Sequence, residues 1–94
     1  MAMKKLKYCP YGSAHVTTYD NGEIHLVSYT TTVITIDPNG WLTCFGTYSR
    51  TTIKHISAFM KEYTPFTYYT AKDAYLNDYA INIHTGEIKP LGGA

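Results

Sequence analysis

The hydrophobic and polar residues alternate through the first half of the chain and then change period. Apolar side chains alternate with threonines over residues 30–37 and 41–47, as expected for half-buried strands. From Ser49 onward the apolar positions follow a helical period instead: Ile53, Ile56, Phe59, Met60 and Tyr63. This pattern predicts an amphipathic helix over about residues 49–63. We expect it to end before Thr64, because the residue that precedes a proline is pushed away from helical angles.

A second, shorter helix is predicted over about residues 70–78. Thr70 and Asp73 have the spacing of a capping box with Asp in place of Glu, and helix-compatible residues follow. Residues 63–69, which include four aromatic side chains, are then expected to form a loop between the two helices.

Three turn sequences divide the predicted strands. At residues 20–23, Asn-Gly predicts a type I′ hairpin turn that pairs Tyr19 with Ile24, and this register places His15 and His25 on opposite faces. At residues 37–40, Pro38 and Gly40 predict a type I turn followed by a bulge. Residues 84–87 join two short strands, of which the last contains a proline and is expected at an edge.

These elements predict a single α+β domain over residues 1–94. We expect an antiparallel sheet built from hairpins, with one main helix and one short helix packed on one face. Residues 1–12 carry Lys4, Lys5 and Lys7, so this segment is expected to form either a mobile basic arm or a frayed terminus.

The composition and charge of the chain argue against several classes of function. The 94 residues are 45% hydrophobic and 16% charged, and no apolar run approaches the roughly 20 residues of a membrane helix, so we expect a folded protein without a membrane partner. The opening lysines have no apolar stretch behind them, which argues against a secretory signal. Cys9 and Cys44 form neither a disulfide framework nor a zinc motif, so we expect no metal, no cofactor and a reducing cytoplasm. The net charge of +1 does not indicate a particular class of partner.

The segment around the start of the main helix carries the candidate chemistry. Ser49 fits a helix N-cap, and His55 is either a boundary residue that hydrogen-bonds a strand or an exposed site residue. A hydrolase or transferase centred on Ser49 and His55 is an alternative, but no orienting acid can be assigned, so we predict no catalytic residues.

Arg50, the chain's one arginine, stands where a cation opposes the helix dipole. Its side chain either pairs with Asp37, Glu62 or a partner's carboxylate, or is solvated at little cost. The chain has ten tyrosines, and Tyr68 and Tyr69 serve either as a binding surface or as a roof over the core. The candidate binding residues are therefore these: Arg50, Lys54, His55, Tyr68 and Tyr69.

The runs "SYTTTVITID", "NGWLTCFG" and "YSRTTIKHISAFMKEY" show an SY-x-T-x-V…YS-x-TT-x-x-HI pattern over Ser28 to Tyr63. This pattern resembles that of a family of small uncharacterised proteins encoded by bacteriophages and mobile elements of Gram-positive bacteria. The resemblance implies a setting, that of a phage or prophage accessory protein in the bacterial cytoplasm, and no activity. In that setting we expect stoichiometric binding that inhibits or modulates a host protein, such as a CRISPR effector or another defence effector. A nucleic-acid-binding accessory protein is the alternative, and the chain is expected to be a monomer or a homodimer.

Overall fold

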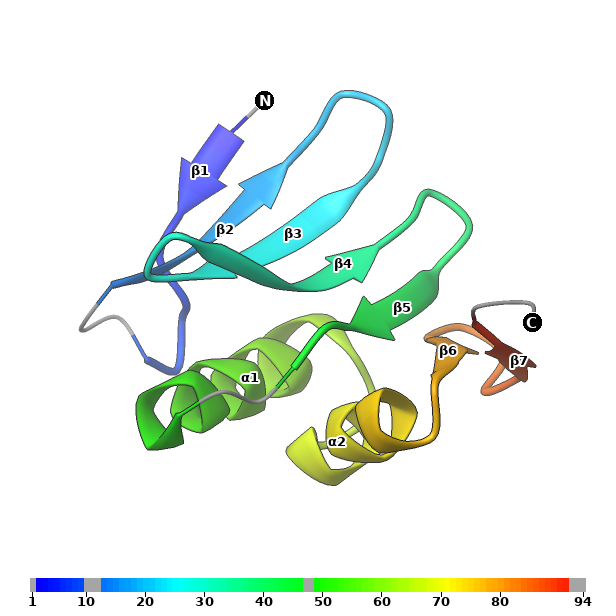
Figure 1. Cartoon of the computed structure of the whole chain (residues 1–94). Coiled ribbons are helices and arrows are strands. Elements are labelled where there is room, and N and C mark those ends of the chain that lie inside the picture. Colours follow the sequence, from blue (N-terminus) through cyan, green and yellow to red (C-terminus); the bar gives the residue numbers. More distant parts are fainter. Residues whose placement is uncertain (1, 10–12, 47–48, 92–94) are drawn as a thin grey trace.

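The computed structural model describes residues 2–9, 13–46 and 49–91 of the chain. Within these ranges, seven antiparallel strands form one sheet in sequence order, and two helices lie between the fifth and sixth strands along the chain. The strands are β1 (Ala2–Lys4), β2 (Ala14–Thr18), β3 (Ile24–Ser28), β4 (Thr31–Ile36), β5 (Trp41–Cys44), β6 (Tyr79–Asn82) and β7 (Ile88–Pro90). The helices are α1 (Arg50–Tyr63) and α2 (Tyr68–Leu76). This architecture confirms the predicted α+β fold (Figure 1).

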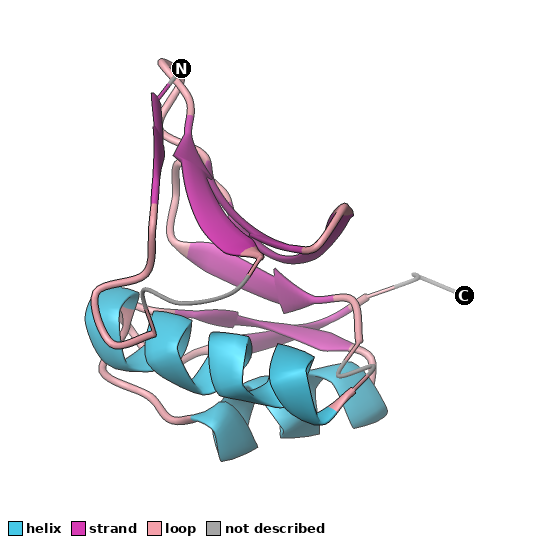
Figure 2. Cartoon of the chain, turned by 90° about the vertical axis from the view of Figure 1, so that its left-hand side faces the viewer, coloured by secondary structure: helices cyan, strands magenta, loops and turns pink. Residues whose placement is uncertain are grey.

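Both helices lie on the same side of a twisted sheet (Figure 2). Helix α1 packs against β3, while α2 packs against β5 and β6. Each strand sends alternate side chains toward the helices, so one face of the sheet becomes apolar. The core is formed by these residues of the sheet and of α1: Val16, Leu26, Val33, Ile34, Ile36, Leu42, Ile56, Phe59 and Met60.

Helix α1 has the boundaries and the buried face that its sequence predicts. Ser49 is the N-cap and accepts a hydrogen bond from the backbone N–H of Thr52, and Thr64 is the C-cap. Ile56, Phe59 and Met60 are buried, whereas Ile53 and Tyr63 are half-buried at the edges of the apolar face.

Helix α2 begins earlier than predicted. Thr67, not Thr70, is the N-cap residue and has extended backbone angles, and the helix runs over Tyr68–Leu76. The Thr64 side chain bonds the backbone of Phe66 and closes the connection after α1, so the chain becomes helical directly afterwards. Tyr68 and Tyr69 therefore lie in the first turn of a helix and not in a loop.

The first hairpin has a different register from the predicted one. Tyr19 pairs with Glu23 through its N–H, and Gly22 has a φ of 98° and closes a turn with Tyr19, which leaves a three-residue loop. Asn21 accepts a hydrogen bond from the Glu23 backbone instead of adopting a positive φ, so the type I′ turn does not form. Thr18, not Tyr19, pairs with Ile24. The prediction for His15 and His25 was also wrong, because this register places both on the face that points away from the helices.

The other two turns are confirmed. Gly40 has a φ of 92° and its N–H donates to the carbonyl of Asp37, as expected for a type I turn that ends in a left-handed residue. Gly86 closes the last hairpin in the same left-handed conformation, with a φ of 79°. Strand β7, which contains the proline, lies at the sheet edge.

The described part of the predicted basic arm, residues 2–9, belongs to the fold. Strand β1 pairs with β2, and Leu6 is buried in the core. The backbone N–H of Lys7 donates to Glu62 Oε1 at 2.8 Å, and Lys4 Nζ lies 3.8 Å from the other oxygen of Glu62. The two contacts with Glu62 tie the segment to the last turn of α1, and the burial of Leu6 anchors it in the core. The arm interpretation is therefore corrected for these residues, and residues 1 and 10–12 lie outside the described ranges.

Candidate functional site

Four polar side chains from β3 and from the start of α1 form a connected cluster, which we call the hydroxyl–imidazole network: Ser28, Ser49, Thr52 and His55. Ser28 Oγ lies 2.9 Å from Nδ1 of His55 and 3.1 Å from Oγ1 of Thr52. Thr52 Oγ1 lies 3.3 Å from Oγ of Ser49. The network joins the end of a strand to the first turns of the helix that covers it.

The centre of the network is buried. His55 is 1% exposed and Ser28 is 3% exposed. Burial lowers the pKa of His55 below its ordinary value, so the imidazole is held neutral near pH 7. Of the two alternatives for His55, the structure shows the boundary residue that hydrogen-bonds a strand. His55 is therefore removed from the candidate contact surface, because a partner cannot reach it.

A strained hairpin residue covers this cluster. Tyr29, which follows Ser28, has a φ of 58°, and its ring centroid lies 6.1 Å from that of His55. Positive φ is uncommon for a residue with a bulky side chain and costs of the order of 1 kcal/mol. The tight turn between β3 and β4 holds Tyr29 in this conformation, where its ring lies over the imidazole.

The polar residues of the SY…YS-x-TT-x-x-HI pattern thus meet in space although they are far apart in sequence. Ser28 comes from β3, while Ser49, Thr52 and His55 come from the start of α1. Tyr48, which also belongs to the pattern, lies outside the described residues. The nucleophile–base geometry of a serine hydrolase is not formed by Ser49, since its hydroxyl bonds Thr52 and caps the helix.

The cations at the start of α1 point outward. Arg50 and Lys54 are exposed, and within the described ranges neither forms an ion pair with Asp37, Glu62 or another carboxylate. The expectation of an intramolecular partner for Arg50 is therefore not met there. Its charge remains beside the positive end of the helix dipole and faces solvent.

Two hollows flank the outer side of α1. One, of about 530 Å³, lies between α1 and the start of α2 and is lined by Ile53, Ser57, Lys61, Phe66, Thr67, Tyr68 and Tyr69. The other, of about 370 Å³, lies between α1 and the segment after β1 and is lined by Tyr8, Cys9, Ile53, Lys54, Ser57, Ala58 and Lys61. Ile53, Ser57 and Lys61 line both hollows and are spaced by four residues, so they form one row along the helix, which we call the α1 ridge.

Aromatic side chains form the outer walls of these hollows. Tyr69 is 75% exposed, and its ring packs edge-on against that of Tyr68 at a centroid distance of 5.6 Å. Tyr68 is half-buried and also packs against the core, so it serves both as wall and as roof. On the other side, the Lys61 ammonium lies 4.4 Å from the centroid of the Tyr8 ring.

The structure thus brings Lys54, Tyr68 and Tyr69 to one surface and places Arg50 one turn from Lys54 on the same helix. It leaves out His55. The sequence hypothesis takes the exposed side of this helix as part of the contact surface, but it does not include Tyr8, and it assigns Ile53 to the apolar stripe. The sequence did contain a signal for the α1 ridge. Ile53, Ser57 and Lys61 recur at intervals of four residues, which places them in one row along a helix. Ile53 is the one apolar residue of this row and stands beside two polar residues on the outer side of the helix.

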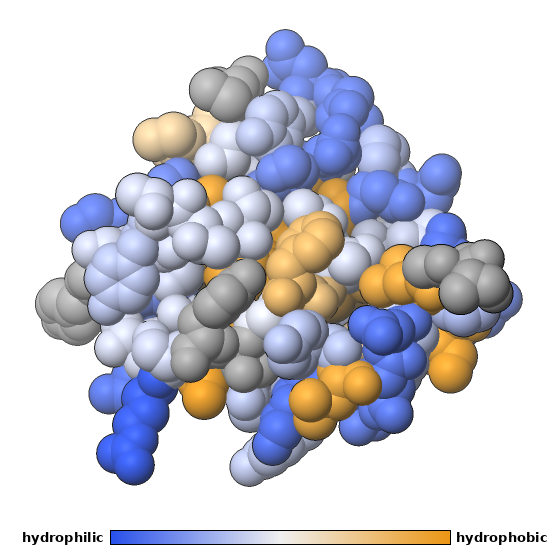
Figure 3. Space-filling model, viewed as in Figure 1, coloured by the Kyte–Doolittle hydropathy of each residue, from blue (hydrophilic) through white to orange (hydrophobic). Residues whose placement is uncertain are grey.

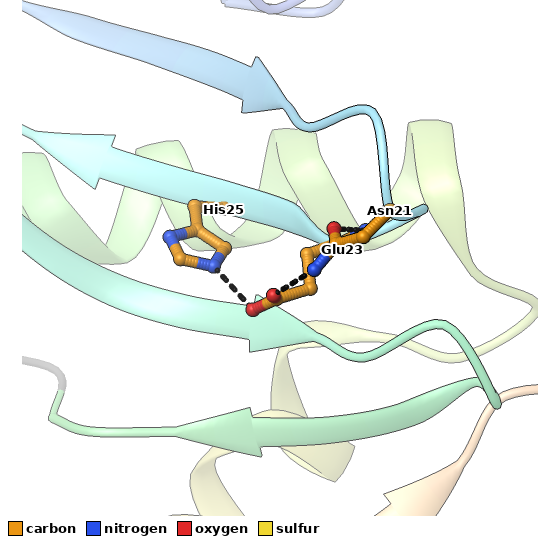
Figure 4. Close-up of polar contacts among 3 residues, drawn as sticks. All are labelled: Asn21, Glu23 and His25. Atoms are coloured by element: carbon orange, nitrogen blue, oxygen red, sulfur yellow. Dashed lines mark hydrogen bonds and ion pairs between the residues drawn. The ribbon is translucent and has the colours of Figure 1, made fainter. Parts of the chain in front are cut away.

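A second polar cluster lies at the tip of the first hairpin (Figure 4). Glu23 accepts from the Asn21 side chain at 2.6 Å and lies 3.2 Å from Nε2 of His25. The hydrogen bond from Asn21 and, next, the contact with His25 lower the pKa of the Glu23 carboxyl. All three residues lie within one turn and its flanking strand, so the cluster stabilises the hairpin locally.

Within the described ranges, no group of three or more His, Cys, Asp or Glu side chains is placed to hold a metal ion. Neither of the two described helices is long and apolar enough to cross a membrane.

On the face shown in Figure 3, hydrophobic side chains gather toward α2 and the β6–β7 hairpin. Two exposed aliphatic residues belong to these elements, Leu76 of α2 and Ile88 of β7. Neither residue lines one of the two hollows.

Comparison with known proteins gives one match. Neither the curated proteins nor the solved structures contain a match to this chain. A family model described as a family of unknown function, DUF8033, matches residues 3–80. The match spans every strand from β2 to β5, both helices and the hydroxyl–imidazole network. The chain therefore belongs to the DUF8033 family, whose function is unknown.

Proposed function

We propose that the protein is a phage or prophage accessory protein that acts in the bacterial cytoplasm by stoichiometric binding to a host protein, such as a CRISPR effector or another defence effector. The observation that carries the binding role is the surface on the outer side of α1, where two hollows with tyrosine walls share the α1 ridge. The phage setting rests on the resemblance of the Ser28–Tyr63 pattern alone.

The surface has the composition of a protein-binding site. Tyrosine and arginine are enriched at interfaces because tyrosine offers a large, stiff area and arginine offers planar hydrogen bonding. Here Tyr8, Tyr68 and Tyr69 stand beside the α1 ridge, and Arg50 lies at its N-terminal end. The half-buried Ile53 supplies an apolar floor. A partner that fills both hollows would bury these aromatic walls at small entropic cost.

The geometry favours binding over catalysis. The two groups that a hydrolase or transferase would use, the Ser49 hydroxyl and the His55 imidazole, serve respectively as a helix cap and as a buried partner of Ser28. The hollows are lined by no described histidine and no described carboxylate. The commonest general bases, histidine and carboxylate, are therefore missing from the described lining.

The nucleic-acid alternative finds less support in the same region. Of the lysines that such a protein would use, Lys4 pairs with Glu62, and the backbone of Lys7 is bonded to the same carboxylate. The Tyr8 ring is approached by the ammonium groups of both Lys61 and Lys7, at 4.4 Å and 5.5 Å from its centroid. These contacts leave less free aromatic surface for base stacking than the composition suggests.

Capture from a lysate of a Gram-positive bacterium tests the proposal. We expect Tyr69→Ala to reduce the yield of the captured host protein by about tenfold, because exposed aromatic anchors dominate binding energy. Tyr69 is the cleanest position because Tyr68 also packs on the core. Tyr75→Ala is the matched control, since Tyr75 is an exposed tyrosine of the same helix that lines neither hollow.

Capture that survives both Tyr69→Ala and the combined Tyr68→Ala, Tyr69→Ala change, with both variants folded by circular dichroism, would exclude this surface. Capture that Tyr75→Ala reduces as strongly would move the site to another side of α2. Light scattering of the isolated chain distinguishes a monomer from a homodimer before the capture is interpreted.

A further inference from the structure

The outer side of α1 carries an uncompensated positive charge. Arg50, Lys54 and Lys61 are exposed cations on the same helix, and none of the residues that line either hollow is acidic. Glu62 is the acidic residue of α1, and it is turned toward the segment after β1, where Lys7 N–H and Lys4 Nζ contact it. The two hollows therefore lie in a positive potential that favours an anionic partner.

The shape of the surface restricts how such a partner lies. Ser57 is a small residue in the middle of the α1 ridge and lines both hollows. A chain that crosses α1 at this position approaches the helix backbone closely, because no large side chain stands in its way. Its neighbouring side chains then enter the hollow beside Tyr8 on one side and the hollow beside Tyr69 on the other.

The lining indicates what those side chains are. Ile53, Ala58 and Phe66 provide apolar contacts within the hollows, and the tyrosines provide amphipathic walls. Volumes of about 370 and 530 Å³ leave room for large aliphatic or aromatic side chains. Apolar anchors bury well here, while carboxylates beside them would reach the lysines on the rim.

We propose that the occupant of this surface is an acidic segment of a partner protein, which crosses the α1 ridge at Ser57 and places one apolar side chain in each hollow. This inference rests on the proposed binding function and names the chemistry of its partner. A protein segment fits better than a nucleic acid because the hollows are apolar and separate. A nucleic acid requires a continuous basic track and open aromatic faces, whereas the ammonium groups of Lys7 and Lys61 already lie against the Tyr8 ring.

Titration with model peptides, followed by the amide signals of the isotope-labelled chain, tests the inference. The probe is a capped glutamate-rich peptide with two phenylalanines one helical turn apart, and the comparison peptide has glutamine in place of every glutamate. We expect the acidic peptide to shift the signals of the α1 ridge and to bind about tenfold more tightly than the glutamine peptide at about 50 mM salt. An oligothymidylate of similar length is the nucleic-acid probe.

Charge reversal locates the interaction. We expect the combined Lys54→Glu, Lys61→Glu change to weaken binding of the acidic peptide by about tenfold or more, because two attractive contacts become repulsive. The combined Lys5→Glu, Lys72→Glu change is the matched control, since both lysines are exposed and neither lines a hollow. It alters net charge equally and is expected to change the affinity by no more than about twofold.

Three results would overturn the inference: equal affinity for the glutamine peptide, tighter binding of the oligothymidylate, or no shift of the ridge signals with any probe. The experiments also distinguish a failure of this inference from a failure of the proposed binding function. If host-protein capture is lost in Tyr69→Ala but kept in the Lys54→Glu, Lys61→Glu variant, the acidic partner is refuted while the binding function stands.

Discussion

Replacing His55 by alanine is expected to weaken the fold by about 3 kcal/mol. The imidazole is fully buried, and truncation of a buried side chain of this size costs roughly 2–4 kcal/mol through lost packing and the cavity left behind. The lost hydrogen bond to Ser28 contributes about 1 kcal/mol of this, and no more, because Ser28 keeps its contact with Thr52. A domain of 94 residues is stable by roughly 5–14 kcal/mol, so the variant should still fold.

Urea unfolding followed by the fluorescence of Trp41, the chain's one tryptophan, measures this loss. Thermal unfolding followed by the same fluorescence should show the loss as a fall in Tm of roughly 12–24 °C, since each kcal/mol shifts the thermal midpoint of a domain of this size by about 4–8 °C. The exposed His84, changed to alanine, is the control and is expected to move stability by less than about 0.5 kcal/mol. Ser28→Ala combined with His55→Ala should cost about 1 kcal/mol less than the sum of the single changes, because the two residues share one bond.

The same residue makes stability depend on pH. Burial lowers the pKa of His55 in the folded chain below the unfolded value of about 6.5, so the unfolded state binds more protons as the solution becomes acidic. Protonation of His55 therefore does not affect stability above about pH 6.5, and below that pH it lowers stability by up to about 1.4 kcal/mol per pH unit until the folded pKa is reached. The difference between parent and His55→Ala in urea midpoints at pH 7.5 and 5.5 isolates this contribution. Equal stability of the two proteins at pH 7.5, or parallel pH profiles below 6.5, would refute the assignment of His55 as a buried, neutral partner of Ser28.

Three further changes follow from the structure. Arg50→Glu is expected to stabilise the chain by about 0.5–1 kcal/mol in urea unfolding, because it replaces a cation beside the positive end of the helix by an anion. Arg50→Gln should give about half of this gain, and 1 M salt should remove most of it. A loss of stability would mean that the guanidinium has a partner. Gly40→Ala should lower the free energy of unfolding by about 1 kcal/mol more than Gly86→Ala does. Both positions need a positive φ, but only at Gly40 does the added carbon collide with the His84 ring. Equal falls in Tm for the two variants would contradict the collision. In a chain whose other cysteine is serine, Cys44 should react with a thiol reagent only as fast as the chain opens, because burial raises the pKa of its thiol; labelling at the rate of a free thiol would place Cys44 at the surface.

Helix α1 follows from local sequence signals. Ser49 is followed by an apolar stripe and then by Thr64-Pro65, so the cap, the face and the end of α1 are all encoded within the same stretch. The turn at Gly40 is equally local, since Pro38 sets the first angle and only a residue that tolerates positive φ fits the last position.

The register of the first hairpin could not be predicted in this way. Two loops compete at Asn-Gly, and they differ in whether Asn21 adopts a positive φ or uses its side chain to bind the Glu23 backbone. The choice is settled by the hydrophobic pairing of Val16 with Leu26, which points both toward the helices. That pairing depends on the whole sheet and not on the turn.

Helix α2 shows a related limit. Thr70 has the sequence of a cap, yet Thr67 is the residue with extended angles, because the side chain of Thr64 has already closed the connection around Phe66. Tyr68 and Tyr69 become helical as a result and project beside α1. The candidate surface could be predicted in part, through Lys54, Tyr68 and Tyr69, but not in its geometry, since one of its two sides comes from Tyr8 and the other from α2, far apart in sequence.

The hydroxyl–imidazole network separates the question of the fold from the question of function. Ser28, Thr52 and His55 have the residue types of an active site, but each of them is buried and each bonds another member of the network. Their effect is to fix α1 on β3, and this contact also fixes which side of α1 faces outward. The α1 ridge and its cations are presented to solvent because the opposite side of the helix is held by the network and by the apolar core. A variant that loosens the network should therefore weaken the proposed partner binding only as far as it lowers the folded fraction of the chain, whereas Tyr69→Ala or charge reversal at Lys54 should weaken it at unchanged stability.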